Sequence, residues 1–250
     1  MVLNLKGFSV NKYSKLLASL LLMAVFAATP ASAISISDFT TIPPPSVILT
    51  FDAITSNNPN TAQTDAIGDN IGLGVAYDAV QELLLFEFVN LAADGVIAEI
   101  YFDDDNGLLG NLGIYDESGA GVDFATNAES EVKPRDLPGG NAVGFVADRE
   151  LSSQANNPAP KKGVGSGERV TLSFSFLGND LEQIITSLGD GSLRTGMHVI
   201  SIGEYSEGFV NTPFDPNTPP GPQVPIPEPA TALLLGMGVA ATVIRRRFAA

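Results

Sequence analysis

The stretch Val170-Thr171-Leu172-Ser173-Phe174-Ser175-Phe176 alternates apolar and hydroxyl side chains without interruption. Successive side chains of a β-strand point to opposite faces, so this order places the four apolar side chains on one face and the three hydroxyls on the other. Such alternation is typical of an antiparallel strand with one face in the core and one face toward solvent. The stretch predicts a half-buried antiparallel strand.

The rest of the central sequence indicates more short strands and one short helix. Residues 46–52 place Val47, Leu49 and Phe51 on one face of a strand. A helix is predicted over 181–188, capped by Asn179 or Asp180 and ended by Gly189. Further predicted strands are 82–91, 96–102, 112–115, 121–124, 142–147 and 193–202. Short strands separated by turn residues, without an internal repeat, predict a mainly β fold: an antiparallel β-sandwich of jelly-roll or Ig-like type.

The N-terminus has the features of a secretory signal peptide. Three lysines and no acid precede the apolar stretch Leu16–Ala28, and Ala31-Ser32-Ala33 follows. A basic flank, a short apolar helix and small residues before the cleavage point form the usual pattern. We expect residues 1–33 to be the signal peptide, cut by signal peptidase after Ala33, with an uncleaved anchor as the alternative.

The C-terminus has three ordered parts that follow a proline-rich spacer over 211–226. They are Pro227-Glu228-Pro229, an apolar run over 230–244, and the cluster Arg245, Arg246 and Arg247. Prolines end a helix, and arginines after an apolar run stay on the cytoplasmic side of the membrane. A single-pass tail anchor is the alternative, but 15 apolar residues at 1.5 Å each give about 22 Å, less than the ~30 Å hydrocarbon core.

The segment Val224–Gly236 with its arginine cluster resembles the PEP-CTERM sorting domain of Gram-negative bacteria. The resemblance implies that exosortase, a membrane-embedded cysteine transpeptidase, recognises and cleaves the tail, here called the sorting signal, 227–250. It also implies transient insertion of the C-terminal helix in the inner membrane, and a destination at the cell surface or in the extracellular matrix. The expected domains are then a signal helix at 1–33, a sandwich at 34–210, a spacer at 211–226 and the sorting signal.

Charge and composition restrict the possible partners of the expected mature chain. Residues 34–226 hold seven basic and 27 acidic residues, a net charge of −20. This charge repels phosphate backbones, so we expect no nucleic-acid partner. The absence of cysteine excludes disulfides and thiol chemistry.

The acidic turn Asp103-Asp104-Asp105-Asn106-Gly107 is the strongest candidate for chemistry. Calcium prefers six to eight oxygen ligands, and closely spaced carboxylates supply several of them. The spacing differs from an EF-hand, because three acids are consecutive. We therefore consider Asp103 and Asp105 as possible calcium ligands, with a solvated turn at the end of a strand as the alternative.

Catalysis has weaker support. His198 is the only histidine, within a strand-like segment, and Ser166 lies among glycines at 163–167 without the strand and helix that a nucleophile elbow requires. No pair of acids stands out for glycoside hydrolysis, and the chain has no tryptophan to form a sugar platform. We expect no catalytic residues and no cofactor, calcium excepted.

Three functions remain open on this evidence. The leading interpretation is a non-catalytic exported protein that exosortase sorts to the cell surface or to the exopolysaccharide matrix. The alternatives are a calcium-dependent carbohydrate-binding module and a secreted hydrolase.

Overall fold

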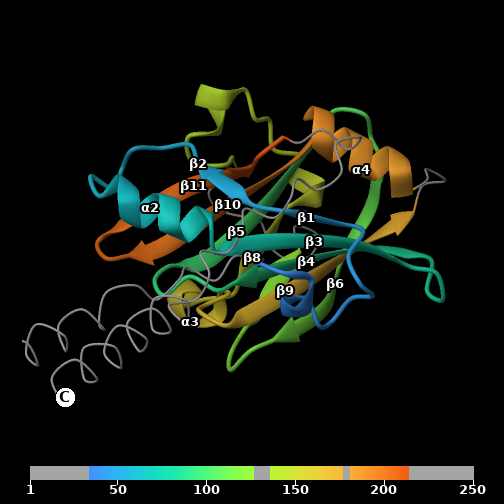
Figure 1. The fold of residues 1–250 in the computed structure, drawn as a ribbon, viewed down its shortest axis with the longest axis horizontal. Helices are drawn as coiled ribbons and strands as arrows, with labels where there is room; N and C mark the ends of the chain where they lie inside the picture. The colour runs from blue at the N-terminus through green and yellow to red at the C-terminus, as the bar shows by residue number, and fades with distance from the viewer. Residues whose placement is uncertain (1–33, 127–135, 177–180, 214–250) are drawn as a thin grey trace, which may run out of the picture. The chain divides into compact units, whose positions relative to one another are not determined.

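The alternating stretch is strand β9 (Glu168–Phe176), which lies between two long strands of one sheet in the computed structural model (Figure 1). The structure describes residues 34–126, 136–176 and 181–213. Val170, Leu172 and Phe174 are fully buried, as the alternation predicts. Thr171, on the opposite face, is fully buried as well, so part of the face expected to meet solvent is covered.

Two antiparallel sheets make up the domain. Sheet A has the strand order β1-β3-β4-β9-β6, and sheet B has the order β2-β11-β10-β5-β8-β7. The strands of sheet A besides β9 are β1 (Val47–Leu49), β3 (Ile71–Asp78), β4 (Leu83–Asn90) and β6 (Leu109–Ser118). The strands of sheet B are β2 (Phe51–Ala53), β5 (Val96–Asp104), β7 (Phe124–Thr126), β8 (Ser153–Ala155), β10 (Leu193–Ile202) and β11 (Tyr205–Asn211). The helices are α2 (Thr61–Gly68), α3 (Ala159–Lys162) and α4 (Leu181–Asp190), with single 3-10 turns η1 (Ile36–Asp38), η2 (Gly140–Val143) and η3 (Arg149–Leu151).

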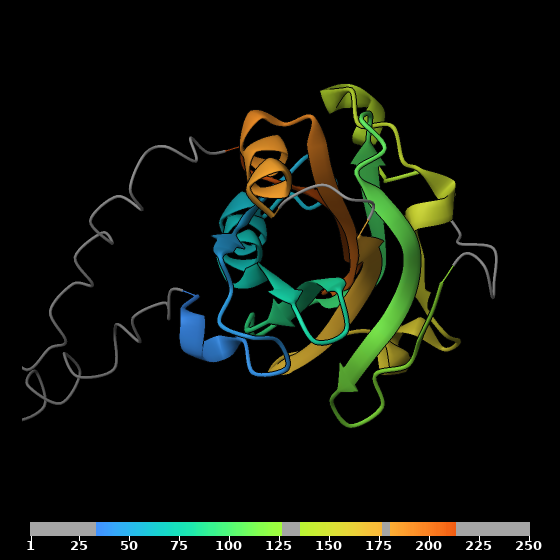
Figure 2. The same cartoon turned by 90° about the vertical axis from the view of Figure 1, so that its right-hand side faces the viewer.

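The two sheets bury one shared core. Phe86 and Phe174 of sheet A meet Phe102 of sheet B edge to face, with ring centroids 5.4 and 4.9 Å from that of Phe102. Apolar side chains of both sheets belong to this cluster. Figure 2 shows the curvature of the strands in the two sheets. The mainly β, sandwich-like architecture is confirmed.

The predicted strand at 46–52 is wrong as a single element. It is two short strands, because β1 pairs with β3 in sheet A whereas β2 pairs with β11 in sheet B. Leu49 and Phe51 are both buried in the shared core. The chain therefore passes from one sheet to the other without breaking the apolar alternation.

The strand predicted at 142–147 is also wrong. The 3-10 turn η2 lies there, between Gly139 and Gly144, which both have positive φ. Phe145 packs with Leu137 and Tyr101 over the outer face of sheet B. The apolar residues of this segment were predicted to form a strand, but they cover the outer face of a sheet instead. The strand expected at 121–124 is displaced as well, since β7 begins only at Phe124.

The other strand predictions agree with the structure, and the predicted helix corresponds to α4, which extends to Asp190. Its expected caps, Asn179 and Asp180, lie outside the described residues. Strands β3, β8 and β11 and helices α2 and α3 were not predicted. In β3, glycines at alternate positions weaken the strand pattern, as the sequence Ile-Gly-Leu-Gly-Val shows.

Asp123 joins three segments at the edge of sheet B. Its carboxylate accepts hydrogen bonds from Lys162 Nζ and Asn156 Nδ2, both at 2.7 Å. The bond from Lys162, followed by that from Asn156, lowers the pKa of Asp123 below its ordinary value of 3.8.

We expect Lys162→Met to raise the pKa of Asp123 toward that ordinary value, measured by an NMR pH titration of its carboxyl carbon. Because the pKa is lowered in the folded state, these bonds stabilise the fold above the unfolded pKa, and this contribution is lost as pH falls through the folded pKa. Lys161→Met is the control, and an equal shift in both variants would contradict a direct effect of Lys162.

Candidate functional site

A cleft of about 820 Å³ opens between the edges of the two sheets. Strands β6 and β9 of sheet A line one side, and the end of β5, strand β7 and turn η3 line the other. Strand β6 contacts both β7 and η3, so the cleft lies where the sheets approach each other. The lining residues are Asp104, Gly107, Leu109, Gly110, Asn111, Leu112, Thr126, Asp148, Glu150, Leu151 and Ser175.

Asp104 enters the cleft from the end of β5. One carboxylate oxygen, Oδ2, accepts a hydrogen bond of 2.8 Å from the backbone N–H of Leu109, which fixes the turn between β5 and β6. The other oxygen, Oδ1, is buried and has no hydrogen-bond partner among the described residues. A buried acceptor without a donor costs free energy, so this oxygen lowers the stability of the turn.

Asp148 and Glu150, at turn η3, bring two further carboxylates to the same side of the cleft as Asp104. Asp148 Oδ1 accepts from the backbone N–H of Glu150 at 3.0 Å, and the backbone N–H of Asp148 donates to Phe102 O at 2.7 Å. On the facing wall, Ser175 Oγ accepts from the backbone N–H of Asn111 at 2.8 Å. The walls are therefore fixed by bonds to the backbone, and none of the lining residues is basic.

The two predicted calcium ligands, Asp103 and Asp105, lie in different surroundings. Asp103 is buried on the outer face of sheet B, where it pairs with Arg194 and accepts a hydrogen bond of 3.1 Å from the backbone N–H of Val146. Asp105 is exposed in the following turn. Among the described residues, no group of three or more acids or histidines is arranged to hold a metal ion. Calcium at Asp103 and Asp105 stays a prediction.

His198 lies in β10, beside Glu99 of β5 in the sheet register, and its Nδ1 is hydrogen-bonded to Glu99 Oε2. Burial is the main cause that raises the pKa of the adjacent Tyr101 far above its ordinary value, and the charge of Glu99 adds to it. Tyr101 therefore stays neutral. Ser166 is exposed in the loop before β9, and no hydrogen bond joins it to His198 in the described part of the chain.

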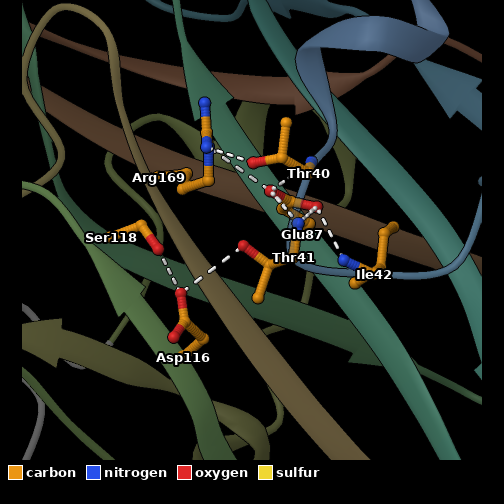
Figure 3. Close-up of polar contacts among 7 residues, drawn as sticks. All are labelled: Thr40, Thr41, Ile42, Glu87, Asp116, Ser118 and Arg169. Atoms are coloured by element: carbon orange, nitrogen blue, oxygen red, sulfur yellow. Dashed lines mark hydrogen bonds and ion pairs between the residues drawn. The ribbon is translucent and has the colours of Figure 1, made fainter.

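A second polar site, on the outer face of sheet A, holds the N-terminal segment of the described chain. Glu87, in the middle of β4, is fully buried. Its carboxylate accepts hydrogen bonds of 3.3–3.4 Å from the backbone N–H groups of Thr40, Thr41 and Ile42. It also forms an ion pair with Arg169 of β9, whose Nε lies 3.4 Å from Oε1 (Figure 3).

Neighbouring side chains complete this attachment. Arg169 also donates to Thr40 Oγ1, and Thr41 Oγ1 donates to Asp116 of β6 at 3.4 Å (Figure 3). Phe39 packs on Gly74 of β3, where an added Cβ would lie 2.6 Å from the phenyl ring. The segment therefore covers a sheet face that the alternation of β9 assigned to solvent. The hydrogen bonds and the ion pair of this site join two parts of the same chain, which indicates a structural role.

The sequence did not predict either site. The cleft residues come from five elements far apart in the chain, and no local pattern joins Asp104 with Asn111, Asp148 or Ser175. Glu87 did leave a signal, because it is a lone acid inside the apolar strand Leu83–Asn90. A buried charge requires partners, and the chain supplies them from more than 40 positions away in Thr40–Ile42.

The predictions for both ends of the chain lie outside the described residues. They include the signal peptide with Ala31 and Ala33, Pro227-Glu228-Pro229, the C-terminal helix and the three arginines. Within 34–126, 136–176 and 181–213, no helix is long and apolar enough to cross a membrane.

Comparison with known proteins identifies the tail. A family model described as the PEP-CTERM protein-sorting motif matches residues 225–247. The match begins at Pro225, inside the expected spacer, and includes Pro227-Glu228-Pro229 and the arginine cluster. Comparisons with curated proteins and with solved structures found no match. The chain thus carries a PEP-CTERM sorting motif, which implies a secreted protein that is targeted by exosortase and directed to the cell surface.

Proposed function

We propose that this chain is a non-catalytic exported protein that exosortase processes and places at the cell surface or in the exopolysaccharide matrix. The motif match at residues 225–247 carries this proposal. The tail would hold the chain briefly in the inner membrane, with Arg245, Arg246 and Arg247 on the cytoplasmic side, until exosortase cuts it near Pro227-Glu228-Pro229. Signal peptidase would remove residues 1–33 at the other end.

The sequence supports a non-catalytic role, because Ser166 lacks the strand and helix that a nucleophile elbow requires. In the described part of the chain His198 is bonded to Glu99 of the same sheet, and no hydrogen bond joins it to Ser166. The acidic surface keeps an exported protein soluble. Calcium-dependent carbohydrate binding and hydrolysis stay predictions: a chelator that left the melting temperature unchanged would count against the first, and turnover of glycoside or ester substrates would support the second.

The sorting proposal is tested by the intact mass of the mature protein from cells with and without exosortase. We expect normal cells to yield a chain that begins at Ile34 and ends near Pro227-Glu228-Pro229, and exosortase-deficient cells to retain the tail through Arg247. Replacing Pro227, Glu228 and Pro229 together by alanine should reproduce the deficient pattern in normal cells.

The matched control is the double substitution of Pro219 and Pro220 by alanine, which removes prolines of the spacer and leaves the motif intact. This control should be processed normally. A mature chain that still extends through Arg247 in normal cells would contradict the proposal.

A further inference from the structure

The turn between β5 and β6 contains Asn106-Gly107, and no other asparagine of the chain is followed by glycine. Both residues are exposed, and no hydrogen bond holds the side-chain amide of Asn106 within the described residues. The carbonyl carbon of that amide is therefore open to attack from within the chain. The nearest nucleophile along the chain is the backbone nitrogen of Gly107, whose attack closes a five-membered ring.

The glycine at position 107 leaves this attack unhindered. A side chain on the residue after an asparagine shields the backbone nitrogen, and glycine has none. An added Cβ on Gly107 would meet no atom within 4 Å, so the surroundings also leave room for the ring. The turn itself requires the glycine, because φ at Gly107 is +62°, in the left-handed region that glycine adopts without strain.

The hydrogen bonds of the turn oppose the reaction only in part. The Gly107 N–H donates to Asp104 O at 3.1 Å, so this bond must break before the nitrogen can attack. Asp104 Oδ1 is buried without a donor among the described residues. Opening of the turn lets water reach this oxygen, which offsets part of the free energy that the broken hydrogen bond costs.

We propose that Asn106 is a site of spontaneous deamidation. The Gly107 nitrogen loses its proton and bonds to the side-chain carbonyl carbon of Asn106, and the amide nitrogen takes up a proton and leaves as ammonia. Water then opens the resulting succinimide at one of its two carbonyl groups, which gives aspartate or isoaspartate. Water is the only co-reactant, and nothing is oxidised or reduced. The reaction belongs to the folded domain and does not depend on how the chain is sorted.

Isoaspartate changes the turn more than the added negative charge does. The main chain of isoaspartate runs through the side-chain carbons, which adds one atom to the backbone between positions 106 and 107. The bond from Gly107 to Asp104 O and the 2.8 Å bond from the N–H of Leu109 to Asp104 Oδ2 both depend on the original spacing. Leu109 is buried where β6 begins, so the start of this strand loses part of its attachment.

Intact mass and peptide mapping of the exported protein, kept folded at mildly alkaline pH, test the site. Each deamidation adds about 1 Da, and we expect the gain in the peptide that contains Asn106. Asn106→Gln should slow the gain at least about tenfold, because the attack must then close a six-membered ring. Asn111→Gln is the matched control: it changes an exposed asparagine that is followed by leucine, and should leave the rate unchanged.

Hydrogen exchange tests the effect on the turn. The isoaspartate form is separated from the unmodified protein by ion exchange, and the backbone amide of Leu109 should exchange faster in it. Asn106→Asp adds the same charge without lengthening the backbone, so exchange at Leu109 should stay as slow as in the unmodified protein.

Three outcomes would overturn the site. They are no mass gain at Asn106 during a period in which a synthetic peptide of residues 101–110 is converted, equal rates in Asn106→Gln and in the unmodified protein, and aspartate without isoaspartate among the products. The last outcome would mean that water attacks the amide directly and that Gly107 takes no part. Equal exchange at Leu109 in the isoaspartate form and in Asn106→Asp would overturn the effect on the turn.

Discussion

Glu87→Ala is expected to lower the free energy of unfolding by about 3–5 kcal/mol, since removing one partner of a buried ion pair has this effect. The substitution leaves Arg169 without its carboxylate and three backbone N–H groups, those of Thr40, Thr41 and Ile42, without their acceptor. It also leaves a void where a fully buried side chain stood. Chemical unfolding followed by circular dichroism measures the loss, because the chain has no tryptophan.

A local measurement separates this mechanism from general damage to the core. Hydrogen exchange should accelerate at the backbone amides of Thr40, Thr41 and Ile42 in Glu87→Ala more than in the strands of sheet B, because the carboxylate is their acceptor. Glu87→Gln keeps one acceptor oxygen and should have an intermediate effect. Glu204→Ala, in an exposed turn, should change stability by less than about 0.5 kcal/mol. A loss below about 1 kcal/mol in Glu87→Ala would mean that Glu87 does not hold the N-terminal segment.

The sequence predicted those strands in which alternation or apolar content agrees with the final packing. Strand β4 and strand β10 were predicted to within one residue at each end, because both are long and rich in apolar side chains. Strand β3 was missed because Gly72 and Gly74 interrupt its apolar residues, although their lack of a Cβ is what admits Ile34 and Phe39. The need for glycine at these two positions follows from the contact with the N-terminal segment, which the sequence of β3 alone does not reveal. Whether the topology is of the jelly-roll or the Ig-like type stays a prediction.

The functional sites were less accessible to prediction than the strands. Asp103, Asp104 and Asp105 looked equivalent in the sequence, yet the alternation of β5 and the end of the strand give them three different surroundings. Asp103 pairs with Arg194, Asp104 lines the cleft and Asp105 is exposed. The acids that share the cleft with Asp104 follow it by more than 40 residues, so only the tertiary fold could reveal them. The sorting motif was predictable, because its parts are local and ordered along the chain.

Phe102→Ala is expected to lower the free energy of unfolding by about 3–5 kcal/mol, the usual effect of truncating a buried phenylalanine. Phe102 is fully buried and lies edge to face with three rings, those of Phe86, Phe88 and Phe174, at interplanar angles of 76–85°. Each such pair adds about 0.5–1.5 kcal/mol beyond the burial of its area. Phe102 contacts rings of sheet A from sheet B, so its truncation weakens the packing between the sheets as well as the core.

Comparison with an apolar variant that lacks the ring estimates how much the aromatic contacts of Phe102 contribute to stability. Phe102→Leu retains most of the buried apolar surface and should lose only part of the stability that Phe102→Ala loses. Val80→Ala, at a side chain that is 93% exposed, should be within about 0.5 kcal/mol of the unmodified protein. Natural domains are stable by only about 5–15 kcal/mol, so Phe102→Ala should also lower the melting temperature clearly in a thermal scan. If Phe102→Ala and Val80→Ala unfold at the same temperature, the two sheets do not share the core that the three phenylalanine contacts define.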